Sequence, residues 1–320
     1  MAAGPPENAL ITLRLTAIRY AAVDTHLYEF DDPDGRPLPA YEPGAHIDVH
    51  MPSALMRQYS LARPYRSGQP YLVGVKFDRG GRGGSRYLHE QARVGELFRI
   101  APPRNHFPLT ETAAHTVLIA GGIGVTPVWC MAQRLEEIAA PFELHYAVRT
   151  RADAAFLEAL ERMAPRARLH VDVEAGGVLD VAAILAKAPK AAHLYCCGPA
   201  PMMAAFEAAA ADWPPEQVHV EYFSGPAPAP IEGGFTVVLA KSAREFVIAP
   251  GVTILETLRQ AGMSVVASCE QGVCGTCETR VIEGVPDHRD LLLTPAEKAS
   301  NKTMMICCSG SLSDRLVLDL

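Results

Sequence analysis

Hydrophobic and polar positions along the chain form three successive patterns. In the first, from Asn8 to Leu109, short apolar or alternating runs are separated by proline, glycine and aspartate. Such runs predict β-strands, and many short strands with these turns predict a barrel or a sandwich. The strands expected in this section are Leu10–Leu15, His46–His50, Tyr71–Phe77 and Leu97–Ile100.

The second pattern, from Thr110 to Phe223, alternates apolar runs of strand length with longer segments of helical spacing. Alternation of strands with helices predicts a parallel, doubly wound sheet. The expected strands are His115–Ala120, Phe142–Val148, Leu169–Val173 and His193–Cys196, and the expected helices are Val128–Ile138, the alanine-rich Ala154–Met163 and stretches after Leu179 and Pro201.

A stretch rich in proline and glycine, Ser224–Gly234, precedes the third pattern and is expected to be a linker. The elements expected beyond it are strands Phe235–Leu239, Glu245–Ile248, Thr279–Ile282, Met304–Cys307 and Leu316–Leu318, with one helix at Thr253–Gln260. We therefore expect a multidomain protein: a β-barrel at 1–109, an α/β parallel-sheet domain at 110–223, a linker at 224–234 and an α+β domain at 235–320.

Composition narrows the possible partners. The chain has 320 residues and a net charge of -7, without a basic tract, which argues against nucleic acid. The N-terminal segment Met1–Asn8 lacks the pattern of a signal peptide, and the apolar stretch His115–Ala132 is broken by glycine and proline, so no membrane span is expected. Four of the eight cysteines, Cys130, Cys196, Cys197 and Cys308, show no disulfide pattern, which favours a cytoplasmic location.

The other four cysteines carry the most specific signal. Cys269, Cys274 and Cys277, with Cys307 thirty residues further on, have the C-x4-C-x2-C…C spacing of a plant-type [2Fe–2S] ferredoxin. A zinc site would usually pair C-x2-C with a second such pair or with histidines. The adjacent Cys308 is the alternative fourth ligand, and Cys307 is preferred on spacing. Gly272 and Gly275, within the loop, are expected where the backbone needs a positive φ.

A glycine turn follows the first strand of the α/β section. Its residues with possible contacts to a nucleotide phosphate are Gly121, Gly122, Gly124, Thr126 and Pro127. Glycines let a phosphate approach the backbone at a helix N-terminus. Pro127 stands where a strict dinucleotide fingerprint has glycine, so a plain tight turn is an equal alternative.

Cys197, Gly198 and Pro199 follow the strand His193–Cys196. Ligands of open α/β sheets bind at the carboxyl ends of the strands, so this thiol could lie beside a nicotinamide ring. The alternative is a buried structural cysteine, which is common.

Two segments of the first section carry groups that suit a phosphate and a planar ring. Arg57, Gln58, Tyr59 and Ser60 offer a phosphate clamp, a π-face and a hydroxyl, and are expected to begin a strand. The alternative, and the commoner case for such a tetrapeptide, is a surface arginine with a half-buried tyrosine. The glycine-rich loop 80–85 could form a backbone nest for phosphate, or simply a flexible hairpin.

Together, in this order, the motifs resemble those of the phthalate dioxygenase reductase and vanillate demethylase reductase family, and the resemblance covers nearly the whole chain. Asp287–Asp290 and the closing Leu316–Leu320 also match. The resemblance implies a barrel that holds FMN, a central NAD domain and a plant-type [2Fe–2S] ferredoxin domain. Carried over by position, the flavin contacts would be Arg57, Gln58, Tyr59, Ser60, Val75, Lys76, Gly83, Gly84, Ser85, Thr126 and Phe223. Ser224 departs from the glycine of many relatives, which leaves the backbone at Phe223 open.

The resemblance implies an NADH-dependent oxidoreductase that passes electrons through FMN and [2Fe–2S] to a Rieske-type oxygenase acting on an aromatic acid or aryl ether. Ser60 and Cys197 are the candidate catalytic residues. Alternatives are a reductase for a carnitine-type oxygenase or a haem monooxygenase, and an electron carrier without NADH activity. Arg149 and Arg151 follow the second strand of the nucleotide fold and could read a 2′-phosphate, although NADH is favoured. Glu221 is left open between a nicotinamide contact and a solvated carboxylate.

Overall fold

The computed structural model describes residues 10–52, 55–225 and 234–320. The chain forms two compact units, Met1–Glu221 and Tyr222–Leu320. Most of the expected linker, residues 226–233, lies outside the described residues. Within the described part of the chain, no helix is both long and apolar enough to span a membrane.

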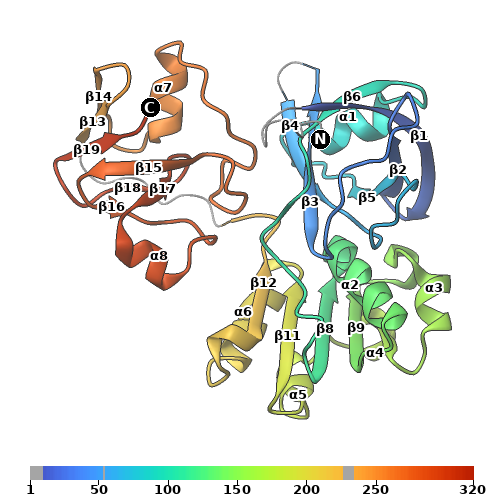
Figure 1. Cartoon of the computed structure of the whole chain (residues 1–320). Helices are drawn as coiled ribbons and strands as arrows, with labels where there is room; N and C mark the ends of the chain where they lie inside the picture. Colours follow the sequence, from blue (N-terminus) through green and yellow to red (C-terminus); the bar gives the residue numbers. More distant parts are fainter. Residues whose placement is uncertain (1–9, 53–54, 226–233) are drawn as a thin grey trace. The chain divides into compact units, whose positions relative to one another are not determined.

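The first sheet is a seven-stranded antiparallel barrel with the strand order β4-β3-β6-β1-β2-β5, while the short β7 pairs with β3 (Figure 1). A bridge between Leu61 and Val73 joins the two ends of this order. Buried Tyr28, Ile47 and Phe98 belong to the apolar core inside it. The elements are β1 Ile11–Ala22, β2 Thr25–Asp31, β3 Ala45–Met51, β4 Leu55–Ser60, β5 Tyr71–Lys76, α1 Gly84–Glu90, β6 Leu97–Ile100 and β7 Arg104–Asn105.

The second sheet is parallel, with the order β10-β9-β8-β11-β12 expected of a doubly wound fold (Figure 1). Its central strand β8 is apolar and buried, because helices cover both faces of such a sheet. The strands are β8 His115–Gly121, β9 Phe142–Val148, β10 Ala167–Val171, β11 Ala192–Cys197 and β12 Val218–Glu221. The helices are η1 Gly122–Gly124, α2 Val125–Glu137, η2 Arg151–Asp153, α3 Leu157–Arg162, α4 Asp172–Ala175, α5 Val181–Leu185, α6 Ala200–Ala209 and η3 Pro215–Gln217.

The second unit contains a mixed five-stranded sheet with the order β14-β13-β19-β15-β17 and a small β16–β18 pair. Helix α7 is capped by the Thr253 hydroxyl, which accepts a hydrogen bond from the Glu256 amide at 3.1 Å. The elements are β13 Phe235–Leu239, β14 Arg244–Ile248, α7 Ile254–Gln260, β15 Glu278–Glu283, β16 Pro286–Asp287, α8 Pro295–Ser300, β17 Thr303–Met305, β18 Gly310–Ser311 and β19 Arg315–Leu318.

The expected fold class is confirmed, with corrections to single elements. Residues 57–60 end strand β4 instead of beginning one, because pairing with β3 extends the strand back to Leu55. Strand β10 begins two residues before the expected Leu169 and ends two before Val173. The sequence did not predict the strands β2, β7, β12, β16 and β18 or the helices α1, α4 and α8. Helix α1 was the least expected, because glycines disfavour helices; here Gly83 adopts φ 90° just before the helix, and Leu88 is buried beneath it.

Candidate functional site

The glycine turn after β8 lies directly against the turn after β11. These strands are neighbours, and Ala120 pairs with Cys197. A Cβ atom at Gly124 would lie 2.2 Å from the carbonyl oxygen of Cys197, and one at Gly121 would lie 2.5 Å from Cδ of Pro199. Only glycine permits this approach, so the structure brings the two sequence motifs together at the carboxyl edge of the sheet.

A buried carboxyl group, that of Glu221, lies beside the same edge. Glu221 ends β12 and is the register partner of Cys197 on β11. The hydroxyl of Ser60, the last residue of β4, donates a hydrogen bond to this carboxyl group. Burial nevertheless raises the pKa of Glu221 to about 8, so the carboxyl is mostly protonated at neutral pH. The barrel and the parallel sheet thus meet at a hydrogen bond between Ser60 and Glu221.

Cys197 is a neutral thiol in this setting. Burial raises its pKa well above the ordinary value, and the neighbouring Glu221 carboxyl adds to the rise. Cys197 is therefore a poor nucleophile here, because the reactive form of cysteine is the thiolate. The site presents a neutral thiol and a mostly neutral carboxyl group. This arrangement suits an uncharged ring better than it suits an anion.

One oxygen of Glu221, Oε2, is buried and has no hydrogen-bond partner among the described residues. A buried polar atom without a partner is costly and needs an explanation, of which a bound group is one. A nicotinamide carboxamide carries both a donor and an acceptor and would fit there. Sequence reasoning left the role of Glu221 open because β12, a short and only half-buried strand, gave no recognisable signal.

The glycine-rich loop of the barrel leads into the first turn of α1. A Cβ atom at Gly84 would lie 2.4 Å from Cγ of Arg57, so the arginine stem packs against the loop backbone. One Arg57 nitrogen, Nη2, donates to the Arg82 carbonyl at 2.6 Å, and the Ser85 hydroxyl accepts from the Asp78 amide at 3.0 Å. Amides of a first helical turn together with a guanidinium fit a phosphate group.

In the second unit, the cysteine sulfurs lie as two pairs. Cys274 Sγ accepts a hydrogen bond from the Cys269 amide at 3.4 Å, and the Cys277 and Cys307 thiols hydrogen-bond each other. This mutual contact, with burial, raises the pKa of Cys277. Two further amides, those of Gln271 and Val273, each donate to Cys269 Sγ at 3.4 Å.

Two pairs of thiols suit a cluster of two irons better than one metal ion. Among the described residues, no group of three or more His, Cys, Asp or Glu could hold a single ion. The expected positive φ is confirmed at Gly272, with φ 70°, and at Gly275, with φ 72°. The loop backbone can therefore wrap around the sulfurs with its amides directed at them, as iron–sulfur sites require.

Comparison with known proteins agrees with this geometry. Residues 118–208 match the family model of the oxidoreductase NAD-binding domain, and residues 237–310 match that of the 2Fe-2S iron-sulfur cluster binding domain. The phenoxybenzoate dioxygenase subunit beta of Ectopseudomonas oleovorans is 49% identical over 98% of both chains. The structure of phthalate dioxygenase reductase superposes with a TM-score of 0.74 at 35% identity, over 97% of this chain and 98% of that one.

This chain belongs to the phthalate dioxygenase reductase family. It is an oxidoreductase with an NAD-binding and a [2Fe–2S] domain, and its relatives include reductase components of oxygenase systems. The vanillate O-demethylase oxidoreductase of Pseudomonas sp. (strain HR199 / DSM 7063) is 43% identical over 97% of this chain and 100% of its own length. A self-sufficient cytochrome P450 monooxygenase contains a similar region, with a TM-score of 0.86 and 39% identity over 97% of this chain and 41% of the P450.

Within the family arrangement, the remaining expected contacts occupy different environments. Tyr59 is half-buried on β4, where burial raises its pKa, and Val75 is fully buried on β5. Lys76 is exposed at the end of β5, and Gln58 is half-buried. Thr126 and Pro127 are buried in the first turn of α2, Gly122 has a φ of 52°, and Gly198 packs against Met202.

Phe223 and Cys308 stay open as expectations. Phe223 is 43% exposed and belongs to the second unit, so its place beside a flavin remains a prediction. Cys308 is buried, and its sulfur lies 3.7 Å from the Met305 carbonyl oxygen and 3.8 Å from the Ser309 hydroxyl. The Cys308 thiol also hydrogen-bonds Cys307, whereas the hydrogen-bond partner of Cys277 is Cys307, so the choice of Cys307 as the fourth ligand stays a prediction.

Proposed function

We propose that this chain takes electrons from NADH, passes them through FMN and its [2Fe–2S] cluster, and delivers them to a Rieske-type oxygenase acting on an aromatic acid or aryl ether. The observation that carries the proposal is the convergence of Ser60, Glu221 and Cys197 at the glycine turn of the parallel sheet. When bound, FMN accepts two electrons as a hydride and returns them singly, which matches a two-electron donor to a one-electron cluster.

The barrel residues would hold and orient the flavin. Arg57 and the amides after Gly83 would bind the FMN phosphate, while Tyr59 would offer its ring face and Ser60 its hydroxyl. At the sheet edge, Glu221 Oε2 would hydrogen-bond the nicotinamide carboxamide, and Cys197 would pack against the ring without carrying charge. The proposed roles need only binding, orientation and exclusion of water, because the cofactors supply the redox chemistry.

The nature of the partner is supported by the relatives. Named relatives include the reductase subunit of a 3-chlorobenzoate-3,4-dioxygenase from Comamonas testosteroni, 42% identical over 97% of this chain. Several relatives are named for oxygenases of aromatic acids or aryl ethers, while another, 50% identical, is named a tetrachlorobenzoquinone reductase. The similarity to the P450 named above supports a second candidate, electron delivery to a haem monooxygenase.

The proposed domain boundaries are 1–109 for FMN, 110–223 for NAD, 224–234 for the linker and 235–320 for the cluster. The described sheets, which end at Asn105, Glu221 and Leu318, are compatible with these limits. The cytoplasm is the proposed location, because no disulfide joins any of the eight described cysteines and four of them have cluster spacing.

The test combines cofactor analysis with reconstitution. The purified chain should release FMN, contain two irons and oxidise NADH when a Rieske-type oxygenase and an aromatic acid are supplied. Release of FAD would contradict the flavin assignment. If only a haem monooxygenase supports substrate-dependent NADH oxidation, the second candidate replaces the first. Absence of NADH oxidation with any acceptor, cytochrome c included, would leave an electron carrier.

A further inference from the structure

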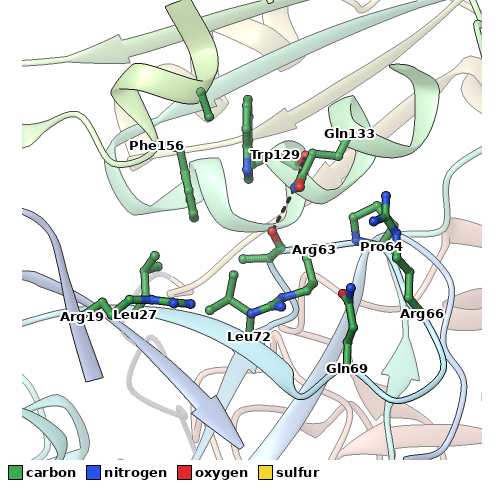
Figure 2. Close-up of a pocket in the computed structure, with 12 residues that line it drawn as sticks. Arg19, Leu27, Arg63, Pro64, Arg66, Gln69, Leu72, Trp129, Gln133 and Phe156 are labelled. Atoms are coloured by element: carbon green, nitrogen blue, oxygen red, sulfur yellow. Dashed lines mark hydrogen bonds between the residues drawn. The ribbon is translucent and has the colours of Figure 1, made fainter. Parts of the chain in front are cut away.

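A cavity of about 380 Å³ opens within the first unit between barrel strands and the helices α2 and α3. Figure 2 shows its two sides, with Trp129 and Phe156 facing Arg63 and Leu72. None of its lining residues belongs to the cofactor contacts described above. This volume is near the lower end of small-molecule pockets, so it suits one ring with one polar group, whereas a dinucleotide would be too large.

One side of the cavity is aromatic. The rings of Trp129 and Phe156 are stacked, with centroids 5.5 Å apart and planes inclined by 12°. Phe156 has a φ of 60°, a conformation that bulky L residues rarely adopt. Backbone strain of this kind persists only where the surroundings over-determine it, and it concentrates at binding sites. The chain thus holds the Phe156 ring against Trp129 at the wall of the cavity.

The facing side is cationic. Arg19, Arg63 and Arg66 line the cavity, and no acidic residue is among the described lining residues. Glu29 accepts hydrogen bonds from Arg19 and Arg63, and Glu137 accepts one from Arg66. These three arginines and two carboxylates leave one positive charge.

The guanidinium of Arg63 uses only part of its hydrogen-bonding capacity among the described residues. Its Nη2 contacts Glu29, but its Nε is buried and has no hydrogen-bond partner among the described residues. The hydroxyl of Tyr41 donates to the Arg63 carbonyl at 2.7 Å, which anchors the backbone of this loop. Gln133 Nε2 adds a bond from α2 to the Ala62 carbonyl at 3.1 Å, drawn in Figure 2. The guanidinium as a whole is 20% exposed, and such a group suits a carboxylate, because arginine binds carboxylate oxygens with directed N–H groups.

We propose that this cavity is a binding site for a small aromatic carboxylate, distinct from the flavin and nicotinamide sites. The ring would lie against Phe156, which covers the buried Trp129, and the carboxylate would accept from the guanidinium of Arg63, whose side chain is 20% exposed. A single negative charge matches the single residual positive charge better than a phosphate dianion does. The site goes beyond the proposed function, because the electron path needs none of these residues.

Trp129 supplies a reporter for the test. The chain has two tryptophans, and Trp213→Phe leaves Trp129 as the only one. Benzoate is titrated into this holoprotein with and without saturating NAD+, and tryptophan fluorescence and calorimetry are both recorded. We expect saturable binding of one benzoate per chain, weaker binding of cyclohexanecarboxylate, which lacks a π-face, and weaker binding of uncharged benzamide.

Two variants locate the ligand. Arg63→Gln should weaken benzoate binding about tenfold or more, as expected for loss of a charged hydrogen bond. Phe156→Leu should weaken it while keeping an apolar side chain. Arg162→Gln, an exposed arginine elsewhere on α3, is the matched control and should bind like the parent. Circular dichroism verifies that each variant is folded.

Several outcomes would overturn the proposal. The proposal is wrong if no saturable signal appears at millimolar benzoate, or if cyclohexanecarboxylate binds as tightly as benzoate. It is also wrong if saturating NAD+ abolishes benzoate binding, or if either folded variant binds benzoate as tightly as the parent. Loss of binding in NAD+ would place the benzoate at the nicotinamide site. NADH-driven reduction of cytochrome c is measured in parallel, so that failure of this site is distinguished from failure of the proposed function.

Discussion

The hydroxyl of Ser60 donates a hydrogen bond to the carboxyl of Glu221, which joins the last residue of a barrel strand to the last residue of the parallel sheet. These residues are far apart in the sequence, and only folding of both sheets brings them together. This hydrogen bond lies beside Cys197 and the glycine turn. Ser60 belongs to the proposed flavin site and Glu221 to the proposed nicotinamide site, so the bond connects the two sites.

The pH dependence of stability should reveal the buried Glu221. Its pKa rises from 4.5 to about 8 on folding, so the folded chain binds more protons than the unfolded chain between these values. The contribution of Glu221 to the free energy of unfolding is therefore fully present below about pH 4.5 and is lost as the pH rises to about 8. At about 1.4 kcal/mol per pKa unit, the loss is of the order of a few kcal/mol.

Glu221→Gln should remove this fall, and its thermal unfolding midpoint should drop less between pH 5 and pH 8 than that of the parent. The exposed Glu216→Gln is the control and should follow the parent. Parallel pH profiles for the parent and Glu221→Gln would show that Glu221 does not titrate as a buried group.

Gly124 should not tolerate a side chain. In Gly124→Ala, a Cβ 2.2 Å from the Cys197 carbonyl oxygen would push the two turns apart. We expect a loss of about 1–3 kcal/mol in unfolding free energy, as for overpacking, together with slower reduction by NADH. Gly177→Ala is the control, because nothing lies within 4 Å of its Cβ position and its φ is not positive. Normal NADH kinetics in Gly124→Ala would contradict the proposed nucleotide contact at this turn.

The two adjacent cysteines should differ in their effect on the cluster. Cys307 hydrogen-bonds Cys277, whereas Cys308 contacts Cys307, the Met305 carbonyl and Ser309 and has no direct hydrogen bond to Cys277 among those described. Cys307→Ser should therefore lose the cluster absorbance and most of the iron, and Cys308→Ser should retain both. Iron analysis after anaerobic purification decides the matter. Cluster loss in Cys308→Ser alone would reverse the assignment of the fourth ligand.

NADH preference should depend on the carboxylates around Arg151. Glu174 accepts two hydrogen bonds from this guanidinium, at 3.2 and 3.1 Å, and Glu161 lies 3.6 Å from it. An arginine so occupied is poorly available to a 2′-phosphate. Glu174→Gln should raise kcat/KM for NADPH several-fold, measured by cytochrome c reduction, while the exposed Glu158→Gln should not. Equal NADPH use by the parent and Glu174→Gln would exclude Arg151 as the reader of the 2′-phosphate.

Several features could be predicted from local sequence because their causes are local. Strands β6, β9 and β13 have the predicted bounds, since short apolar runs between turn residues report strands directly. The cysteine spacing predicted the loop, and the φ values of Gly272 and Gly275 agree. Elements without such signals were missed. Strand β12 is short and half-buried, and α1 begins at a glycine, Gly84, directly after Gly83, and packs through the buried Leu88.

The sequence alone determined which groups are present: a cysteine set spaced for two irons, glycines at the ends of strands, and an order of motifs that indicated the family. Tertiary structure decided which of these groups meet and in what state. It brought Glu221 into a hydrogen bond with Ser60, where burial keeps the Glu221 carboxyl mostly protonated at neutral pH. It also stacked Phe156 on Trp129, in the wall of the cavity that Arg63 lines. Proximity and desolvation arise from residues distant in the chain, so neither can be deduced from spacing along the sequence.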